Sequence, residues 1–218
     1  MDSKTTILLA DDHALLRDAL RDRLRSEPDF EVVGVTSDGE EAISEAARLK
    51  PDVILMDIDM PGTICFEAAK TIKSISPHTR VIYVSAFFND RYIESALAAN
   101  ASGYITKDEA PEIVIEAIRR AAKGFAYFSS KVQSRLVVDG AGVRLQSSSK
   151  SRASMLTERE LEVLRYVARG MSKKEIAKVM VIAVKTVDRH CANLMSKLEI
   201  HDRVALARFA IREGLAEA

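Results

Sequence analysis

Five residues with chemically useful side chains follow short apolar segments in the first half of this 218-residue chain. They are three carboxylates, one hydroxyl and one ammonium: Asp11, Asp12, Asp57, Ser85 and Lys107. Together such groups can hold a phosphoryl group. A metal ion and the ammonium neutralise its oxygens, the hydroxyl donates a hydrogen bond, and a carboxylate accepts the group as nucleophile. This chemistry requires that the side chains meet in the folded chain.

The pattern of elements in residues 1–124 predicts that they do meet. Five apolar segments rich in Val and Ile alternate with five helical patterns, which is typical of βαβ units and a parallel sheet. The apolar segments span residues 6–10, 31–35, 53–56, 81–84 and 103–105, and the helical patterns span residues 14–26, 40–49, 66–75, 91–99 and 111–122. Continuous apolar strands indicate a sheet covered on both faces. We predict an α/β, doubly wound (βα)5 domain, with its ligand site at the carboxyl ends of the strands.

The acids at that edge also favour a metal ion. Mg²⁺ takes oxygen ligands in octahedral geometry, usually one or two carboxylates with waters and a phosphate oxygen. A solvated strand-end acid is the simpler interpretation of any single one of Asp11, Asp12 and Asp57. Three acids that converge on one edge favour a Mg²⁺ site instead. The four histidines show no metal-ligand spacing, so no zinc site is expected.

Charge is divided unevenly along the chain. Residues 1–124 contain 15 Lys and Arg against 22 Asp and Glu, a net charge of −7, and residues 125–218 contain 17 against 10, a net charge of +7. The basic half is therefore a candidate for binding nucleic acid. The apolar stretches are too short to cross a membrane and no signal-peptide pattern is present, so we expect a cytoplasmic protein without membrane contact. Two cysteines are too few for a disulfide framework.

The basic half has a different pattern of elements. Residues 125–153 carry glycines, serines and basic residues with little apolar periodicity, which indicates a linker, with a short helix expected at residues 130–138. Residues 154–218 carry four helical patterns, and a three-residue connection at 181–183 joins the second to the third. Such a pair in a small basic bundle is typical of a helix-turn-helix. Two of the helices begin with capping boxes, Thr157 with Glu160 and Ser172 with Glu175.

Motifs in both halves resemble one family. ADD, ILMDIDMPG, VSA and GYITKD look like the receiver domain of bacterial two-component response regulators, and LTERELEVLRYVARGMSKKEIAKVM with KTVDRH looks like the LuxR-type helix-turn-helix. Their order and spacing resemble NarL/FixJ-type response regulators over nearly the whole chain. The resemblance implies a flavodoxin-like receiver domain at residues 1–124, a linker at 125–153, and a smaller all-α helix-turn-helix domain at 154–218. It implies a phosphorylation-controlled transcription regulator, not a turnover enzyme, with a sensor histidine kinase and double-stranded DNA as partners.

The resemblance also implies roles for single receiver residues. Asp57 would accept the phosphoryl group from the kinase, and Lys107 would pair with the phosphoryl oxygens. Ser85 and Tyr104 would form a switch pair, in which the hydroxyl moves to the phosphate and the aromatic ring follows inward. Such a rearrangement is a two-state shift biased by local electrostatics.

Four positions would make up the Mg²⁺ site by the same resemblance. Asp12 and Asp57 would bind the ion through their carboxylates. Asp59 would contribute its backbone carbonyl, so its side chain is not required as a ligand. Asp11 would act nearby or through a water molecule.

The DNA contacts are expected on the helices of the basic half. A recognition helix of this architecture enters the major groove by its N-terminal part, where we expect Lys185, Thr186 and Arg189. Further candidates, better suited to phosphates, are Lys173, Lys174, His190 and Lys197. A homodimer on paired half-sites is expected, because one small helix-turn-helix gives little affinity alone. Residues 203–212 would be the family's usual dimer contact, and a core-packing helix is an equally good interpretation.

Three residues depart from the family pattern. Cys65 stands where the family has Gly, and its Cβ constrains the loop after the Met-Pro-Gly turn and could alter kinase docking. Ala183 stands where a Ser often caps the recognition helix, a loss of about 1 kcal/mol of helix stability. Asp188 lies on a helix expected to face DNA, where it would repel phosphate or accept a hydrogen bond from a cytosine amino group.

Two other functions compete with this interpretation. The D-x-D spacing of Asp57 and Asp59 is that of haloacid-dehalogenase-type phosphatases, with a nucleophile and a general acid. Such enzymes usually carry the motif on their first strand, whereas here it follows the third. The other competitor is an interaction protein of the same fold that works without phosphorylation. The complete set of acids argues against it.

Overall fold

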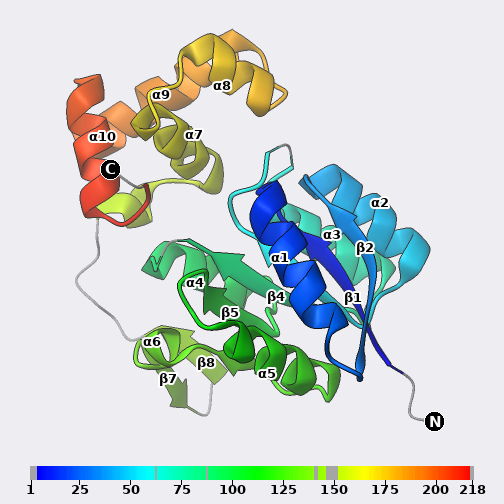
Figure 1. The fold of residues 1–218 in the computed structure, drawn as a ribbon. Helices are drawn as coiled ribbons and strands as arrows, with labels where there is room; N and C mark the ends of the chain where they lie inside the picture. Colours follow the sequence, from blue (N-terminus) through cyan, green and yellow to red (C-terminus); the bar gives the residue numbers. More distant parts are fainter. Residues whose placement is uncertain (1–3, 62, 87, 140–141, 146–151, 217–218) are drawn as a thin grey trace. The chain divides into compact units, whose positions relative to one another are not determined.

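A computed structural model describes residues 4–61, 63–86, 88–139, 142–145 and 152–216 of the chain. The chain divides into a unit built on a β-sheet and a unit of helices, which are described separately (Figure 1). No helix within the described residues is long and apolar enough to cross a membrane.

The first unit is a parallel sheet of six strands in the order β2-β1-β3-β4-β5-β6. The strands are β1 (Thr5–Ala10), β2 (Phe30–Thr36), β3 (Val53–Asp57), β4 (Arg80–Ser85), β5 (Gly103–Thr106) and β6 (Tyr127–Phe128). The helices between them are α1 (Ala14–Arg25), α2 (Gly39–Leu49), α3 (Cys65–Ile75), α4 (Asp90–Ala98) and α5 (Pro111–Ala122). The doubly wound α/β architecture is therefore confirmed, with the two-residue strand β6 added at one edge.

Helices cover both faces of the sheet, which explains the apolar strands. Helices α1 and α5 lie together on one face, and α2 and α3 lie together on the other (Figure 1). On the first face Leu24 of α1 and Ile118 of α5 are fully buried in one core cluster with alternate strand residues such as Leu55. On the second face Phe66 of α3 packs on Tyr83, with ring centroids 5.0 Å apart. Every residue of β3 is buried, including the acid that ends it.

The segment after α5 contains more regular structure than the sequence suggested. Strand β6 pairs with β5, and α6 (Ser130–Gln133) follows it. The helix expected at residues 130–138 is thus shorter, because β7 (Leu136–Asp139) pairs antiparallel with β8 (Gly142–Leu145) instead. The β-branched Val137 and Val138 favour this extended backbone.

The second unit is a bundle of helices. After the 3₁₀ helix η1 (Arg152–Met155) come α7 (Glu158–Ala168), α8 (Lys173–Val179), α9 (Val184–Leu198) and α10 (Arg203–Arg212). Both predicted capping boxes are confirmed. The Thr157 N–H donates to Glu160 over 2.8 Å and the Ser172 N–H donates to Glu175 over 2.7 Å. Helix α9 packs on α7 and α8, and α10 packs on α7, so α8 and α9 form the predicted helix-turn-helix.

The turn between α8 and α9 has an unusual backbone conformation. Val181 has a positive φ of 53°, a backbone conformation that β-branched residues rarely adopt. Ala183 is the N-cap of α9 and makes no side-chain capping bond. The recognition helix thus begins without the hydroxyl or carboxylate that Thr157, Ser172 and Asp202 supply to the other helices.

Adding the missing cap should stabilise the helical unit. Because the Ala183 backbone already has the extended conformation of an N-cap, Ala183→Ser should raise its free energy of unfolding by about 1 kcal/mol. Ser172→Ala, which removes an existing cap, should lower it by about the same amount. Amide hydrogen exchange of α7 to α10 in the full chain, which reports the free energy of unfolding of this unit, measures both. No gain from Ala183→Ser beside a normal loss from Ser172→Ala would contradict the prediction.

Candidate functional site

Strand register brings the acids together at the carboxyl edge of the sheet. Ala10 of β1 pairs with Met56 of β3, so the residues that follow them, Asp11 and Asp57, are neighbours. The Lys107 N–H, just past β5, donates to the carbonyl of Ser85 at the end of β4 over 2.7 Å. The predicted convergence of strand ends is therefore present in the structure.

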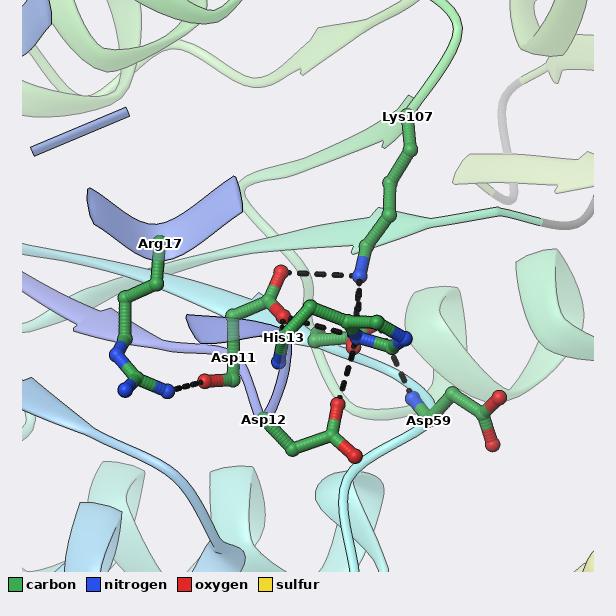
Figure 2. Close-up of polar contacts among 7 residues, drawn as sticks. Asp11, Asp12, His13, Arg17, Asp59 and Lys107 are labelled. Carbon is green, nitrogen blue, oxygen red and sulfur yellow. Dashed lines mark hydrogen bonds and ion pairs between the residues drawn. The ribbon is translucent and has the colours of Figure 1, made fainter. Parts of the chain in front are cut away.

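Lys107 joins two of these carboxylates. Its ammonium Nζ lies 2.8 Å from Asp57 Oδ2 and 2.9 Å from Asp11 Oδ2. Figure 2 shows the lysine reaching from one side and Asp11 from the other, with Arg17 of α1 donating to the Asp11 backbone carbonyl. The lysine and both acids are largely buried, with side-chain exposures of 13%, 0% and 13% for Lys107, Asp57 and Asp11. Because this ion pair is largely shielded from water, the attraction between its charges is stronger than in a surface pair. Removing these charges from water still costs free energy.

Burial dominates the titration of Asp57. Its carboxylate is removed from water, which raises its pKa from 3.8 to about 6, although the Lys107 charge opposes the shift and the Asp11 charge adds to it. Burial alone would lower the pKa of Lys107, but the charges and hydrogen bonds of Asp57 and Asp11 raise it overall. A cationic Lys107 and an ionised Asp57 thus coexist above pH 6.

Asp12 and His13 complete the cluster. His13 Nδ1 lies 2.8 Å from Asp12 Oδ1 and 3.2 Å from Asp11 Oδ1, and Figure 2 shows its ring lying over the acids. Burial raises the pKa of Asp12; the charge of His13 lowers it and that of Asp11 raises it. Together with Asp57, these residues offer ligand atoms that all lie within 4.8 Å of one another. Sequence reasoning named the three acids and missed His13, because spacing between histidines was the only signal considered.

The donor chemistry of this cluster fits a divalent cation. Three carboxylates at one edge supply the oxygen ligands that Mg²⁺ takes. The Asp59 N–H donates to Asp57 Oδ1 over 3.2 Å, so the Asp59 backbone adjoins the site. Its carboxylate points away from the cluster in Figure 2. That orientation gives no support to Asp59 as the general acid of a phosphatase.

The two residues expected to act as a switch lie beside the acids. Ser85 follows Val84, which pairs with Asp57, and Ser85 is almost fully buried. Tyr104 pairs with Tyr83 across β4 and β5, and the Tyr104 side chain has no exposed surface. The Tyr104 ring is therefore already turned into the protein interior.

Cys65, the departure near the acids, causes no backbone strain. It is the first residue of α3 and is buried, and helical backbone suits any L-residue.

The helix-turn-helix presents a basic surface at the start of α9. Lys185 is exposed, and Asp188 and Arg189, about one turn further along the helix, are exposed as well. Val187, in contrast, is fully buried. Thr186 is half-buried. Lys174 on α8 is exposed as well. Val187, Leu194 and Leu198 lie on the buried face of α9.

Two of the other candidate DNA contacts are paired with carboxylates within the unit. Lys173 pairs with Asp188, so the acid on the recognition helix is neutralised by its neighbour. Lys197 Nζ lies 2.6 Å from Glu160 of the first capping box. Burial lowers the pKa of His190, and the charge of Arg189 lowers it further, while the charge of Glu160 opposes the shift.

Comparison with known proteins agrees with both units. Residues 7–119 match the response regulator receiver domain, and residues 154–210 match the bacterial regulatory proteins of the luxR family. The chain is 36% identical over 214 residues to the uncharacterized transcriptional regulatory protein YxjL of Bacillus subtilis, covering 98% of each chain. It is also 36% identical over 214 residues to the response regulator protein VraR of Staphylococcus aureus, covering 97% of this chain and 98% of that one.

Solved structures share the fold. RcsB of Salmonella typhimurium superposes with a TM-score of 0.72 at 24% identity, covering 97% of this chain and 99% of that one. The receiver domain of the putative response regulator NarL of Mycobacterium tuberculosis gives a TM-score of 0.54 at 31% identity, covering 56% of this chain and 98% of that one.

Fold, site and similarity together define a receiver domain followed by a LuxR-type DNA-binding domain. The chain belongs to the LuxR-family response regulators of bacterial two-component systems. It is therefore a transcriptional regulator and not a turnover enzyme.

The raised pKa of Asp57 predicts a specific pH dependence of stability. The pKa of Asp57 in the folded protein is about 6, above its ordinary value of 3.8. The contribution of this residue to folding stability is therefore full below pH 4 and is lost as the pH rises through 6. Two pKa units correspond to about 3 kcal/mol. In EDTA, urea unfolding should show wild type losing up to that amount relative to Asp57→Asn between pH 4 and pH 7. A difference that stays constant, or that grows in favour of wild type, would refute this assignment.

Proposed function

We propose that Asp57 is the phosphoacceptor of this response regulator and that a sensor histidine kinase is its donor. The observation that supports this most directly is the buried Asp57 carboxylate, aimed at the strand edge and paired with Lys107 at 2.8 Å. A carboxylate oxygen attacks the phosphorus of a phosphohistidine and forms the new O–P bond. The P–N bond breaks, and the imidazole nitrogen of the donor keeps the electron pair.

The neighbouring groups have separate tasks in this step. Lys107 holds one Asp57 oxygen and afterwards pairs with the phosphoryl oxygens. Asp12, Asp57 and the backbone carbonyl of Asp59 would hold Mg²⁺, with Asp11 bound indirectly. When bound, the ion supplies charge neutralisation on the phosphoryl oxygens. Several acids at one edge require such a cation once a phosphoryl group adds further negative charge.

Phosphorylation would act on DNA binding through a shift between two states. The Ser85 hydroxyl lies at the end of the strand next to Asp57 and would donate to the phosphoryl group. Tyr104, already inward, would be held there, which stabilises one arrangement of the surface around α4, β5 and α5. A ligand shifts such an equilibrium only by its differential affinity for the two states. The bond from Ser85 to the phosphoryl group would provide that difference.

The helical unit would bind double-stranded DNA through the start of α9. Lys185, Thr186 and Arg189 would enter the major groove, because they lie at the N-terminal end of the recognition helix. Lys173, Lys174, His190 and Lys197 would make secondary contacts or contacts to the phosphates. Lys173 and Lys197 are already paired with carboxylates, so their substitution should cost less affinity.

A homodimer on paired half-sites completes the proposal. Helix α10 buries Leu206 and Phe209 against its own unit, which fits the core-packing interpretation. Val204 and Ile211 on the same helix are 64% and 37% exposed, which supports a dimer contact on its outer face. The domain limits at residues 124 and 154 and a cytoplasmic location are part of the same proposal.

Substitution of the acceptor should abolish phosphorylation. Incubated with acetyl phosphate and Mg²⁺, wild type should gain one phosphoryl group by intact-mass spectrometry, and Asp57→Asn should gain none because the amide is not a nucleophile. Asp59→Asn is the matched control, and it should remain phosphorylated because its side chain points away from the cluster. Uptake by Asp57→Asn at the wild-type level would exclude Asp57 as the acceptor.

Loss of a recognition-helix cation should weaken DNA binding. On a duplex selected by the phosphorylated protein, Lys185→Ala or Arg189→Ala should each cost about 1–3 kcal/mol, roughly 5- to 150-fold in affinity. Lys70→Ala, an exposed lysine on α3, serves as the control and should leave binding unchanged. Fluorescence anisotropy over a range of salt concentrations measures both affinity and its salt dependence. If all three variants bound the duplex with equal affinity, α9 would not be part of the DNA interface.

A further inference from the structure

His13 is the one member of the acidic cluster to which the proposed function gives no task. It precedes α1 as its N-cap, yet its side chain makes no capping hydrogen bond. The His13 backbone N–H donates to Asp11 Oδ1 over 2.8 Å, which fixes the turn between β1 and α1. The imidazole consequently lies over the carboxylates with Nδ1 toward them, and the side chain remains 55% exposed (Figure 2).

The position of Nδ1 is that of a metal ligand. In an octahedral site with bonds of about 2.1 Å, neighbouring ligand atoms lie about 3.0 Å apart. His13 Nδ1 lies 2.8 Å from Asp12 Oδ1 and 3.7 Å from Asp57 Oδ2, on the two carboxylates proposed to bind the ion directly. It lies 3.2 Å from Asp11 Oδ1, whose role at the ion is proposed to be indirect. These distances lie on both sides of the distance expected between neighbouring ligand atoms of one metal ion.

We propose that His13 Nδ1 is a fourth protein ligand of the receiver's cation site, which therefore accepts a divalent transition-metal ion in addition to Mg²⁺. Imidazole is a poor ligand for hard Mg²⁺ and a good one for first-row transition metals. A site of carboxylates alone binds the two classes through the same oxygens. One nitrogen ligand adds affinity for the transition metal only, so His13 sets the metal preference of the site.

Lys107 does not compete for this role. Its ammonium lies 3.5 Å from His13 Nδ1 and remains bound to Asp57 and Asp11. A protonated amine has no lone pair to offer a metal. Among the described residues at this edge, His13 is thus the single nitrogen ligand that the cluster brings within reach of a bound ion.

This inference rests on the proposed cation site but not on phosphorylation, and Mn²⁺ is a suitable probe. With Mn²⁺ bound to the full-length protein, electron spin echo envelope modulation should show coupling to an imidazole ¹⁴N. The coupling should change to that of ¹⁵N when the protein is labelled with [¹⁵N]histidine. His13→Ala should abolish it, whereas His78→Ala, in the loop that precedes β4 at the other end of that strand, should retain it.

Affinity provides the second measurement. By calorimetry, His13→Ala should weaken Mn²⁺ binding by about 10-fold or more, as expected when a metal site loses a ligand contact, and should leave Mg²⁺ binding nearly unchanged. Bound Mn²⁺ without histidine nitrogen coupling, or equal losses for both ions, would overturn the proposal while leaving the phosphoacceptor assignment intact. If neither ion bound, both this inference and the proposed Mg²⁺ site would fail.

Discussion

The ion pair between Lys107 and Asp57 is the interaction on which the receiver site depends. A carboxylate at the end of a fully buried strand is costly to ionise, as its pKa of about 6 shows. Lys107, which follows β5 on the far side of β4, offsets part of this cost and also holds Asp11. In the proposed function, the pair keeps Asp57 ionised and fixed in direction for attack on phosphorus, whereas a buried ion pair by itself adds little stability.

The balance of charge also explains why the carboxyl edge of the sheet needs cations. Asp11, Asp12 and Asp57 share one lysine, so the cluster keeps an excess of negative charge. A phosphoryl group would increase it further. A divalent ion, held in our proposals by the carboxylates and by His13, would offset this charge. Stability, metal binding and phosphorylation are thus linked through the same few atoms, and a change in one alters the others.

Much of this arrangement could be predicted from the sequence, because parallel strands obey simple rules. The apolar runs and the acids that follow them predicted five strands and their common edge, and Thr157 and Ser172 marked the helix starts of the second unit. Strand β6 was missed because two residues carry no periodicity. The helix expected at residues 130–138 was too long because local propensity does not report the pairing of β7 with β8.

Side-chain partners were harder to predict than backbone elements. The sequence placed Lys173, Lys197 and Asp188 on the DNA-binding unit, but only the fold shows that Lys173 neutralises Asp188 and that Lys197 binds a capping-box glutamate. His13 was overlooked for a related reason. Asp11 and Asp12 precede it directly in the chain, but only the fold brings Asp57 of β3 to 3.7 Å from its Nδ1.

The central claim is that Asp57, among four neighbouring acids, is the one that carries the phosphoryl group. Borohydride reduction of the phosphorylated protein converts an aspartyl phosphate to homoserine, which peptide mass spectrometry then locates. Homoserine at position 57, and formed only in the presence of the phosphodonor, is the expected result. Homoserine at Asp11, Asp12 or Asp59 instead would contradict the account.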